Sequence, residues 1–170
     1  MRILILVDIS AEDFLNKRCL DMAKDNIFDK FYTNDDIADY CFTRAVDMTG
    51  YDSSSPLVEP SAGGGAFVRA FQKHGFDKFE AYDIAPESDG IIRQDFLCLD
   101  RGYDGSMCVG NPPFGHRSKL AIEFFNKCAK FSDAIAFVIP VTFDKWERTI
   151  EARWRFQAHL IEAPSRRELQ

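Results

Sequence analysis

The segment from Met107 to Gly115 constrains the fold of this chain more than any other. A short apolar run ends at Gly110, and the sequence Asn-Pro-Pro-Phe-Gly follows it. Two successive prolines fix two φ angles and remove two backbone donors, so they fit neither a helix interior nor an inner strand. The segment therefore predicts a buried strand that ends in a rigid loop. In an open α/β sheet, such a loop lies on the edge where ligands bind.

Composition places this loop in a globular domain. The chain has 170 residues, of which 46% are hydrophobic and 16 are Phe, enough for one domain with a substantial core. The longest apolar runs, such as residues 134–141, are too short to span a membrane, and the N-terminus has no export pattern. The five cysteines form no Cys-x-x-Cys pair, which favours reduced thiols in a cytoplasmic protein and gives little support to a metal site.

Apolar residues recur along the chain in the spacing of strands followed by helices. Strands are expected at residues 1–9, 57–59, 79–84, 91–96, 107–110, 134–139 and 159–161. Helices are expected at residues 11–24, 33–46, 67–71, 120–129 and 142–156. Thr33, followed three residues later by Asp36, is typical of a capped helix start. The short connections predict an α/β fold, a Rossmann-like and mostly parallel sheet with helices on both faces.

A glycine-rich turn follows the expected strand at 57–59. The three successive glycines of residues 63–65 precede a helix, and glycines at such a turn let a ligand approach the backbone because no Cβ intervenes. Asp83 ends the next strand twenty residues after Gly63, the interval at which a Rossmann-like unit presents an acid to a ribose. Further on, Asp95 could accept a hydrogen bond from an adenine amino group while Phe96 packs on the ring. Taken singly, these residues are equally typical of ordinary turns and strand ends.

Five motifs occur in one order along the chain: FYT, EPSAGGGAF, YDI, QDF and NPPFG. Together they resemble the class I S-adenosylmethionine (SAM)-dependent methyltransferases of the amino-group (N6-adenine) type, over about residues 28–161. The resemblance implies a cytoplasmic enzyme with a methyltransferase domain at residues 28–170. Residues 1–27 would then be an N-terminal extension of one strand and one helix.

The resemblance also implies the residues that would hold SAM and the part of the cofactor that each would contact. The glycine turn would border the methionine portion, with an acid near its amino group. Acids at the ends of the next two strands would take the ribose and the adenine. The expected cofactor-binding residues are Phe31, Tyr32, Thr33, Glu59, Ala62, Gly63, Gly65, Asp83, Ile84, Asp95 and Phe96.

The expected catalytic residues are those of the rigid loop. An exocyclic adenine amine is a poor nucleophile because its lone pair is delocalised into the ring. The Asn111 side-chain oxygen and the Pro112 carbonyl can each accept one N–H bond, which favours a pyramidal nitrogen and directs its lone pair at the methyl group. Pro112 and Pro113 hold these acceptors rigidly, and Phe114 can stack on a flipped base. This chemistry needs no metal and no covalent intermediate.

The chain departs from the family pattern in three ways. Asn34 stands where many relatives have Pro, and Glu59 replaces the commoner Asp. DNA-modifying relatives usually add a target-recognition region, and no segment here is long enough to be one. The family sheet usually ends in a hairpin of two strands, but this chain ends near the first of them. It is therefore expected to be naturally minimal, a fragment, or part of an oligomer, and residues 1–9 could fill a sheet-edge position.

Three functions remain open for these motifs. The first is methylation of adenine in DNA or RNA. DNA is favoured because the residues of the FYT and EPSAG motifs are most similar to those of restriction-modification-type enzymes. The second is methylation of a protein glutamine, whose side-chain amide poses the same problem of a weak nucleophile. The third is a SAM-fold subunit without catalysis that binds nucleic acid or a partner enzyme.

A net charge of −6 opposes general attraction to phosphate, so binding nucleic acid would require a local basic face. His116, Arg117 and Lys119 give a small cationic rim directly after the loop. A second basic face, interleaved with two Trp residues, is expected from Lys145, Arg148, Arg153 and Arg155 with Trp146 and Trp154. Alternatively, these Trp side chains are core residues and the charges form a solvated helix face.

Overall fold

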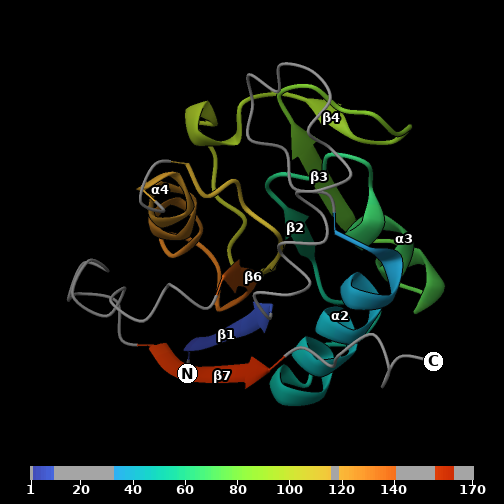
Figure 1. Ribbon diagram of the computed structural model, residues 1–170, viewed down its shortest axis with the longest axis vertical. Coiled ribbons are helices and arrows are strands. Elements are labelled where there is room, and N and C mark those ends of the chain that lie inside the picture. Colours follow the sequence, from blue (N-terminus) through green and yellow to red (C-terminus); the bar gives the residue numbers. More distant parts are fainter. Residues whose placement is uncertain (1, 10–32, 116–118, 141–155, 163–170) are drawn as a thin grey trace.

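The computed structural model describes residues 2–9, 33–115, 119–140 and 156–162, shown in colour in Figure 1. Seven strands within these ranges form one sheet in the order β4-β3-β2-β5-β6-β1-β7, and every neighbouring pair is parallel. In chain order the strands are β1 (Arg2–Ile9), β2 (Leu57–Glu59), β3 (Phe79–Asp83), β4 (Ile92–Arg93), β5 (Met107–Gly110), β6 (Ala134–Pro140) and β7 (Phe156–Glu162). The described helices are α2 (Asp35–Thr49), α3 (Ala66–Lys73), η1 (Phe96–Cys98) and α4 (Lys119–Cys128).

Strand β6 shows why helices cover both faces of the sheet. Successive side chains of a strand point to opposite faces. Ala134, Ala136 and Val138 therefore join the core cluster formed with α2 and α3, whereas Ile135 and Phe137 join the cluster that contains α4. Figure 1 accordingly shows α4 on the side of the sheet away from α2 and α3. The predicted Rossmann-like α/β fold is confirmed.

Aromatic side chains fill both cores. On the α2/α3 face, the ring of Phe42 meets Phe71 and Phe76 in edge-to-face contacts at 4.9 and 5.0 Å between centroids. On the α4 face, Phe96 stacks on Phe124 at 5.9 Å with an interplanar angle of 15°. Aromatic burial of this kind is a large apolar contribution to stability, which accounts for the chain's high Phe content.

The N-cap of helix α2 lies one residue later than the sequence predicts. Asn34 is the N-cap, with φ −67° and ψ 145°, and its side-chain oxygen accepts a hydrogen bond from the N–H of Asp36 at 2.8 Å. The Thr33 hydroxyl is therefore not used as the cap. At the other end, Gly50 adopts φ 72° and donates its N–H to Val46, a common glycine stop for a helix.

The N-terminal strand does not lie at the edge of the sheet. Strand β1 pairs with β6 on one side and with β7 on the other, and both pairings are parallel. The edge position expected for residues 1–9 is taken by β7 instead. Backbone donors and acceptors on both sides of β1 are thereby used in strand pairing.

The expected strand at 91–96 is also shorter than predicted. Pairing with β3 covers only Ile92 and Arg93, and Phe96–Cys98 forms a 3₁₀ turn. Asp95 caps this turn, because one of its carboxylate oxygens accepts the N–H of Leu97 at 2.9 Å. The expected helix at 11–24 lies outside the described residues, as does that at 142–156 apart from Phe156, which begins β7 and is not helical. Within the described part of the chain, no helix combines the length and apolar character that crossing a membrane requires.

Candidate functional site

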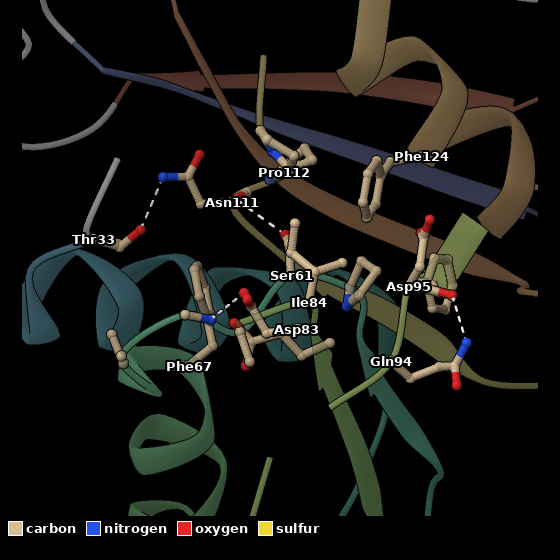
Figure 2. Close-up of a pocket in the computed structure, with 18 of the residues that line it drawn as sticks. Thr33, Ser61, Phe67, Asp83, Ile84, Gln94, Asp95, Asn111, Pro112 and Phe124 are labelled. Carbon is tan, nitrogen blue, oxygen red and sulfur yellow. Dashed lines mark hydrogen bonds between the residues drawn. The ribbon is translucent and has the colours of Figure 1, made fainter. Parts of the chain in front are cut away.

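A cavity of about 440 Å³ opens at the carboxyl ends of β2, β3 and β5. Parallel strands end at the same edge of a sheet, so the segments that follow these three strands meet there. The volume is in the range of a small-molecule site. Figure 2 shows Thr33 and Asn111 at one end of the cavity and Gln94 and Asp95 at the other.

Most of the residues that the sequence singles out line this one cavity. They are Thr33, Glu59, Ala62, Gly63, Asp83, Ile84, Asp95, Phe96, Asn111, Pro112 and Pro113. Gly65 and Phe114 do not line it, and Phe31 and Tyr32 lie outside the described residues.

The glycine turn is held in shape by its own backbone and by Asp83. The N–H of Ala62 donates to the Tyr82 carbonyl at 2.8 Å, and the N–H of Gly65 donates to the Ala62 carbonyl at 2.7 Å. The N–H of Gly63 donates to one Asp83 carboxylate oxygen at 2.8 Å. The turn therefore presents main-chain atoms with no side chain at Gly63 and Gly64, where they line the cavity.

Gly65 ends this turn and caps α3 with a φ of 78°. A Cβ added there would lie 3.2 Å from the Cβ of Ser88, whereas a Cβ at Gly75, with a similar φ of 75°, would meet nothing within 4 Å. We expect Gly75→Ala to cost about 1–2 kcal/mol of unfolding free energy, from the backbone conformation alone. Gly65→Ala is expected to cost more, because Ser88 must also move. Urea unfolding of both variants measures the difference, and equal losses would show that the Ser88 contact is unimportant.

Asp83 has both carboxylate oxygens engaged by main-chain donors. One accepts from Gly63 and the other accepts from the N–H of Ala85, each at 2.8 Å. An ionised carboxylate has about four acceptor positions, so each oxygen can take a further hydrogen bond. Asp83 thus fixes the glycine turn and still offers acceptors to a ligand in the cavity.

Glu59 is a buried acid on the cavity wall. It is only 1% exposed, and its Oε2 has no hydrogen-bond partner among the described residues. Burial raises the pKa of the Glu59 carboxyl well above its usual range, and the nearby charge of Asp83 raises it further, while Arg69 opposes the shift. A buried acceptor of this kind is suited to a cationic or hydrogen-bond-donating ligand group.

The buried carboxyl makes stability depend on pH in a defined direction. Below pH 4.5, the usual pKa of a Glu carboxyl and that of Glu59 in the unfolded chain, Glu59 is protonated in both the folded and the unfolded protein. Its contribution to the unfolding free energy is then at its maximum. As pH rises toward the higher folded pKa, the unfolded state loses its proton first and this contribution is lost. We therefore expect Glu59→Gln to be close to wild type at pH 4 and more stable than wild type at pH 8, because the amide has no charge to bury. Thermal unfolding at both pH values measures the difference, and a pH-independent difference would contradict it.

The far end of the cavity is an aromatic wall beside Asp95. Phe96 and Phe124 line the cavity and stack on each other. The second carboxylate oxygen of Asp95 accepts from the Cys98 thiol at 3.3 Å, so Asp95 is held by two contacts within its own turn. Ile84 lies between the two ends and is 47% exposed, which gives the cavity an apolar surface.

The loop after β5 carries Asn111, which contacts two hydroxyl groups. Its side-chain Nδ2 donates to Thr33 Oγ1 at 3.0 Å, and its main-chain oxygen accepts from Ser61 Oγ at 3.1 Å. Phe114, three residues later, is 7% exposed and is not among the residues that line the cavity. Its stacking on a base stays a prediction.

Charged groups near the cavity are largely paired. Arg69 lines the cavity, donates to the Gly64 carbonyl at 2.7 Å, and forms an ion pair with Asp35 at 2.6 Å. Lys119 lies 3.9 Å from Glu123 on the exposed surface of α4. His116, Arg117 and the second basic face with its Trp residues (Lys145, Trp146, Arg148, Arg153, Trp154, Arg155) lie outside the described residues.

Several lining residues were not expected from the sequence: Ser61, Phe67, Arg69, Gln94, Leu120 and Phe124. Ser61 falls inside the glycine motif, and Phe124 falls on the apolar face of an expected helix, but neither pattern shows that the side chain reaches the cavity. In the described ranges no three His, Cys, Asp or Glu side chains gather as a metal site would require.

Comparison of the sequence with models of protein families finds no match. Comparison with curated proteins also finds none. The cavity and the sequence motifs that line it are therefore the observations that support a function.

Proposed function

We propose that this chain transfers a methyl group from S-adenosylmethionine to the exocyclic amino group of adenine in nucleic acid, with DNA favoured over RNA. The observation that carries the proposal is the position of Asn111 and Pro112, which share one cavity with the glycine turn and Asp83. The residues proposed to act on the amine and those proposed to bind the donor thus line the same space.

The cavity residues fit the donor molecule by their chemistry. Glu59 supplies the buried acceptor that an amino group of the methionine portion requires, beside the exposed main chain of Gly63. Asp83 keeps acceptor positions for ribose hydroxyls. Ile84 and Phe96 offer apolar surfaces to a purine ring, with Asp95 beside them. When bound, the donor supplies an electrophilic methyl group on a positively charged sulfur.

Asn111 and Pro112 would act on the acceptor amine. The Asn111 side-chain oxygen and the Pro112 carbonyl would each accept one N–H bond, which orients the nitrogen and stabilises the positive charge that develops on it. Because Pro112 and Pro113 restrict the backbone, these acceptors need little rearrangement when the substrate arrives.

A second candidate is methylation of a glutamine side chain in a protein. Phe114 of the loop is buried and does not line the cavity, which supports a stacked base less than it supports a side-chain amide. A side-chain amide needs the same pair of acceptors and no stacking partner. The net charge of −6 also fits a protein substrate more easily than a polyanion.

Labelled SAM distinguishes these candidates. The chain is incubated with tritiated SAM and, separately, with single-stranded DNA, double-stranded DNA, RNA and a protein pool, and the modified nucleosides are then identified. We expect label in N6-methyladenine. Label found only in protein would favour glutamine methylation, and a chain that neither binds SAM nor transfers label would contradict both assignments.

A further inference from the structure

Asn111 lies just beyond the last residue of β5 that pairs with its neighbour. Gly110 pairs with Phe137 of β6, and the strand pairing ends there. The sheet therefore does not set the direction of the Asn111 side chain. Two hydroxyl groups contact Asn111 instead, from Thr33 and Ser61, which are 78 and 50 residues earlier in the chain.

We infer that Thr33 and Ser61 are positioning residues for the two acceptors of the substrate amine. Thr33 sets the direction of the Asn111 side-chain oxygen. Ser61 binds the main-chain carbonyl of Asn111 and thereby sets the direction of the Pro112 carbonyl. This inference rests on the proposed function, because the acceptors matter only if an amine enters the cavity.

The Thr33 contact holds the Asn111 amide in one direction, with its buried oxygen at the other end. The two ends of an Asn amide have nearly the same shape, but one donates hydrogen bonds and the other accepts them. Thr33 Oγ1 accepts from Nδ2, and Figure 2 shows the amide oxygen at the end directed away from Thr33. A rotated amide would present N–H groups to an amine that itself must donate N–H bonds. A Thr hydroxyl can also donate, so the contact fixes the direction of the Asn111 side chain, and the orientation in this structure, with Nδ2 on Thr33, is the one whose oxygen can accept such bonds.

Thr33 is available for this contact because α2 is capped by its neighbour. Asn34 accepts the N–H of Asp36, so the Thr33 hydroxyl is not needed at the helix start. The first residue of α2, Asp35, forms two hydrogen bonds with Arg69 at 2.6 and 3.1 Å. Arg69 also donates to Gly64, so the start of α2 is tied to the glycine turn on the cavity wall. The position of Thr33 is fixed by contacts other than its own hydroxyl.

Ser61 acts on the main chain instead. Its Oγ donates to the Asn111 carbonyl, which belongs to the peptide bond that joins Asn111 to Pro112. Holding this carbonyl fixes the plane of that peptide bond, and the ring of Pro112 fixes the following φ. The direction of the Pro112 carbonyl, the second acceptor, depends on both. Ser61 thus orients one acceptor and Thr33 the other.

Methyl-transfer rates under single-turnover conditions test the catalytic consequence. Thr33→Val keeps the side-chain shape and removes the hydroxyl, and we expect a rate loss of about tenfold to a hundredfold that exceeds any change in the Kd for SAM. Thr33→Ser should recover most of that rate, and Ser61→Ala should lose about tenfold. Two matched controls should keep the wild-type rate. Thr49→Val removes a hydroxyl that contacts Ala45 at the far end of α2, and Ser132→Ala removes one that contacts Cys128.

The side-chain amide signal of Asn111 in an NMR spectrum tests the orientation without any activity. The signal is assigned by its loss in Asn111→Ala, and it should move in Thr33→Val and in Ser61→Ala but not in Thr49→Val. An unmoved signal, or a Thr33→Val rate equal to that of Thr49→Val, would overturn the inference. A wild-type chain that transfers no methyl group would instead overturn the proposed function, and the NMR result would still decide whether the two hydroxyls orient Asn111.

Discussion

Replacing Asn111 with Ala is expected to lower methyl transfer by at least about 10²-fold while the protein remains folded and still binds SAM. Removing one preorganised polar group that stabilises a transition state commonly costs about 10²–10³ in rate. Asn111 lies at the end of the cavity away from Asp95 and at the end of β5, so its loss leaves the core and the aromatic wall unchanged. Single-turnover transfer of tritiated methyl groups measures the rate, and calorimetry measures the Kd for SAM.

Asn126→Ala provides the matched control for this change. Asn126 lies on α4 and does not line the cavity, so its removal should leave the transfer rate unchanged. An Asn111→Ala variant with the wild-type rate would show that Asn111 is not an acceptor for the amine. A variant that loses SAM binding together with activity would instead indicate that Asn111 belongs to the donor end of the site.

Replacing Asp83 with Ala is expected to weaken SAM binding by about 10²–10⁴-fold. Hydrogen bonds to a charged group contribute about 1.5–3 kcal/mol each, and the variant loses those to two ribose hydroxyls. The glycine turn also loses its anchor, because the N–H groups of Gly63 and Ala85 no longer have the carboxylate as acceptor. We therefore expect a lower unfolding free energy in addition to the weaker binding, both measurable by calorimetry.

Asp77→Ala is the control, because Asp77 is an exposed acid in the loop before β3 and does not line the cavity. Its Kd for SAM should equal that of the wild type. Asp83→Asn separates the two roles, since an amide retains one oxygen for the turn but carries no charge. A Kd for SAM within threefold of wild type in Asp83→Ala would remove Asp83 from the proposed donor site.

Much of the fold was predictable because its signals are local. The glycine run at 63–65 and the prolines after Gly110 each end a short apolar strand, and a chain that alternates such strands with helices is expected to form a parallel sheet. Parallel order brings the ends of β2, β3 and β5 to one edge. The resemblance to the methyltransferase motifs implied one site for Glu59, Asp83 and Asn111, and this parallel order places all three on one cavity.

Other features could not be predicted, because they depend on contacts between distant segments. Strand β1 lies between β6 and β7 as a result of pairing on both sides, which its apolar sequence does not specify. The N-cap is Asn34 and not Thr33, and the sequence does not decide between them because both residue types can cap a helix. The burial of Phe114 likewise depends on its neighbours in space.

The sequence by itself indicated most of the residues that line the cavity, since glycines and prolines impose their backbone geometry wherever they occur and end the strands at this edge. Only the tertiary structure decided how the rigid loop is held. Its Asn111 is oriented by hydroxyl groups from Thr33 and Ser61, and each of these hydrogen bonds forms only after the sheet has brought three separate loops within about 3 Å of one another. A hydroxyl side chain can serve as a cap, a surface group or a positioning residue, and its surroundings in the folded chain select among them.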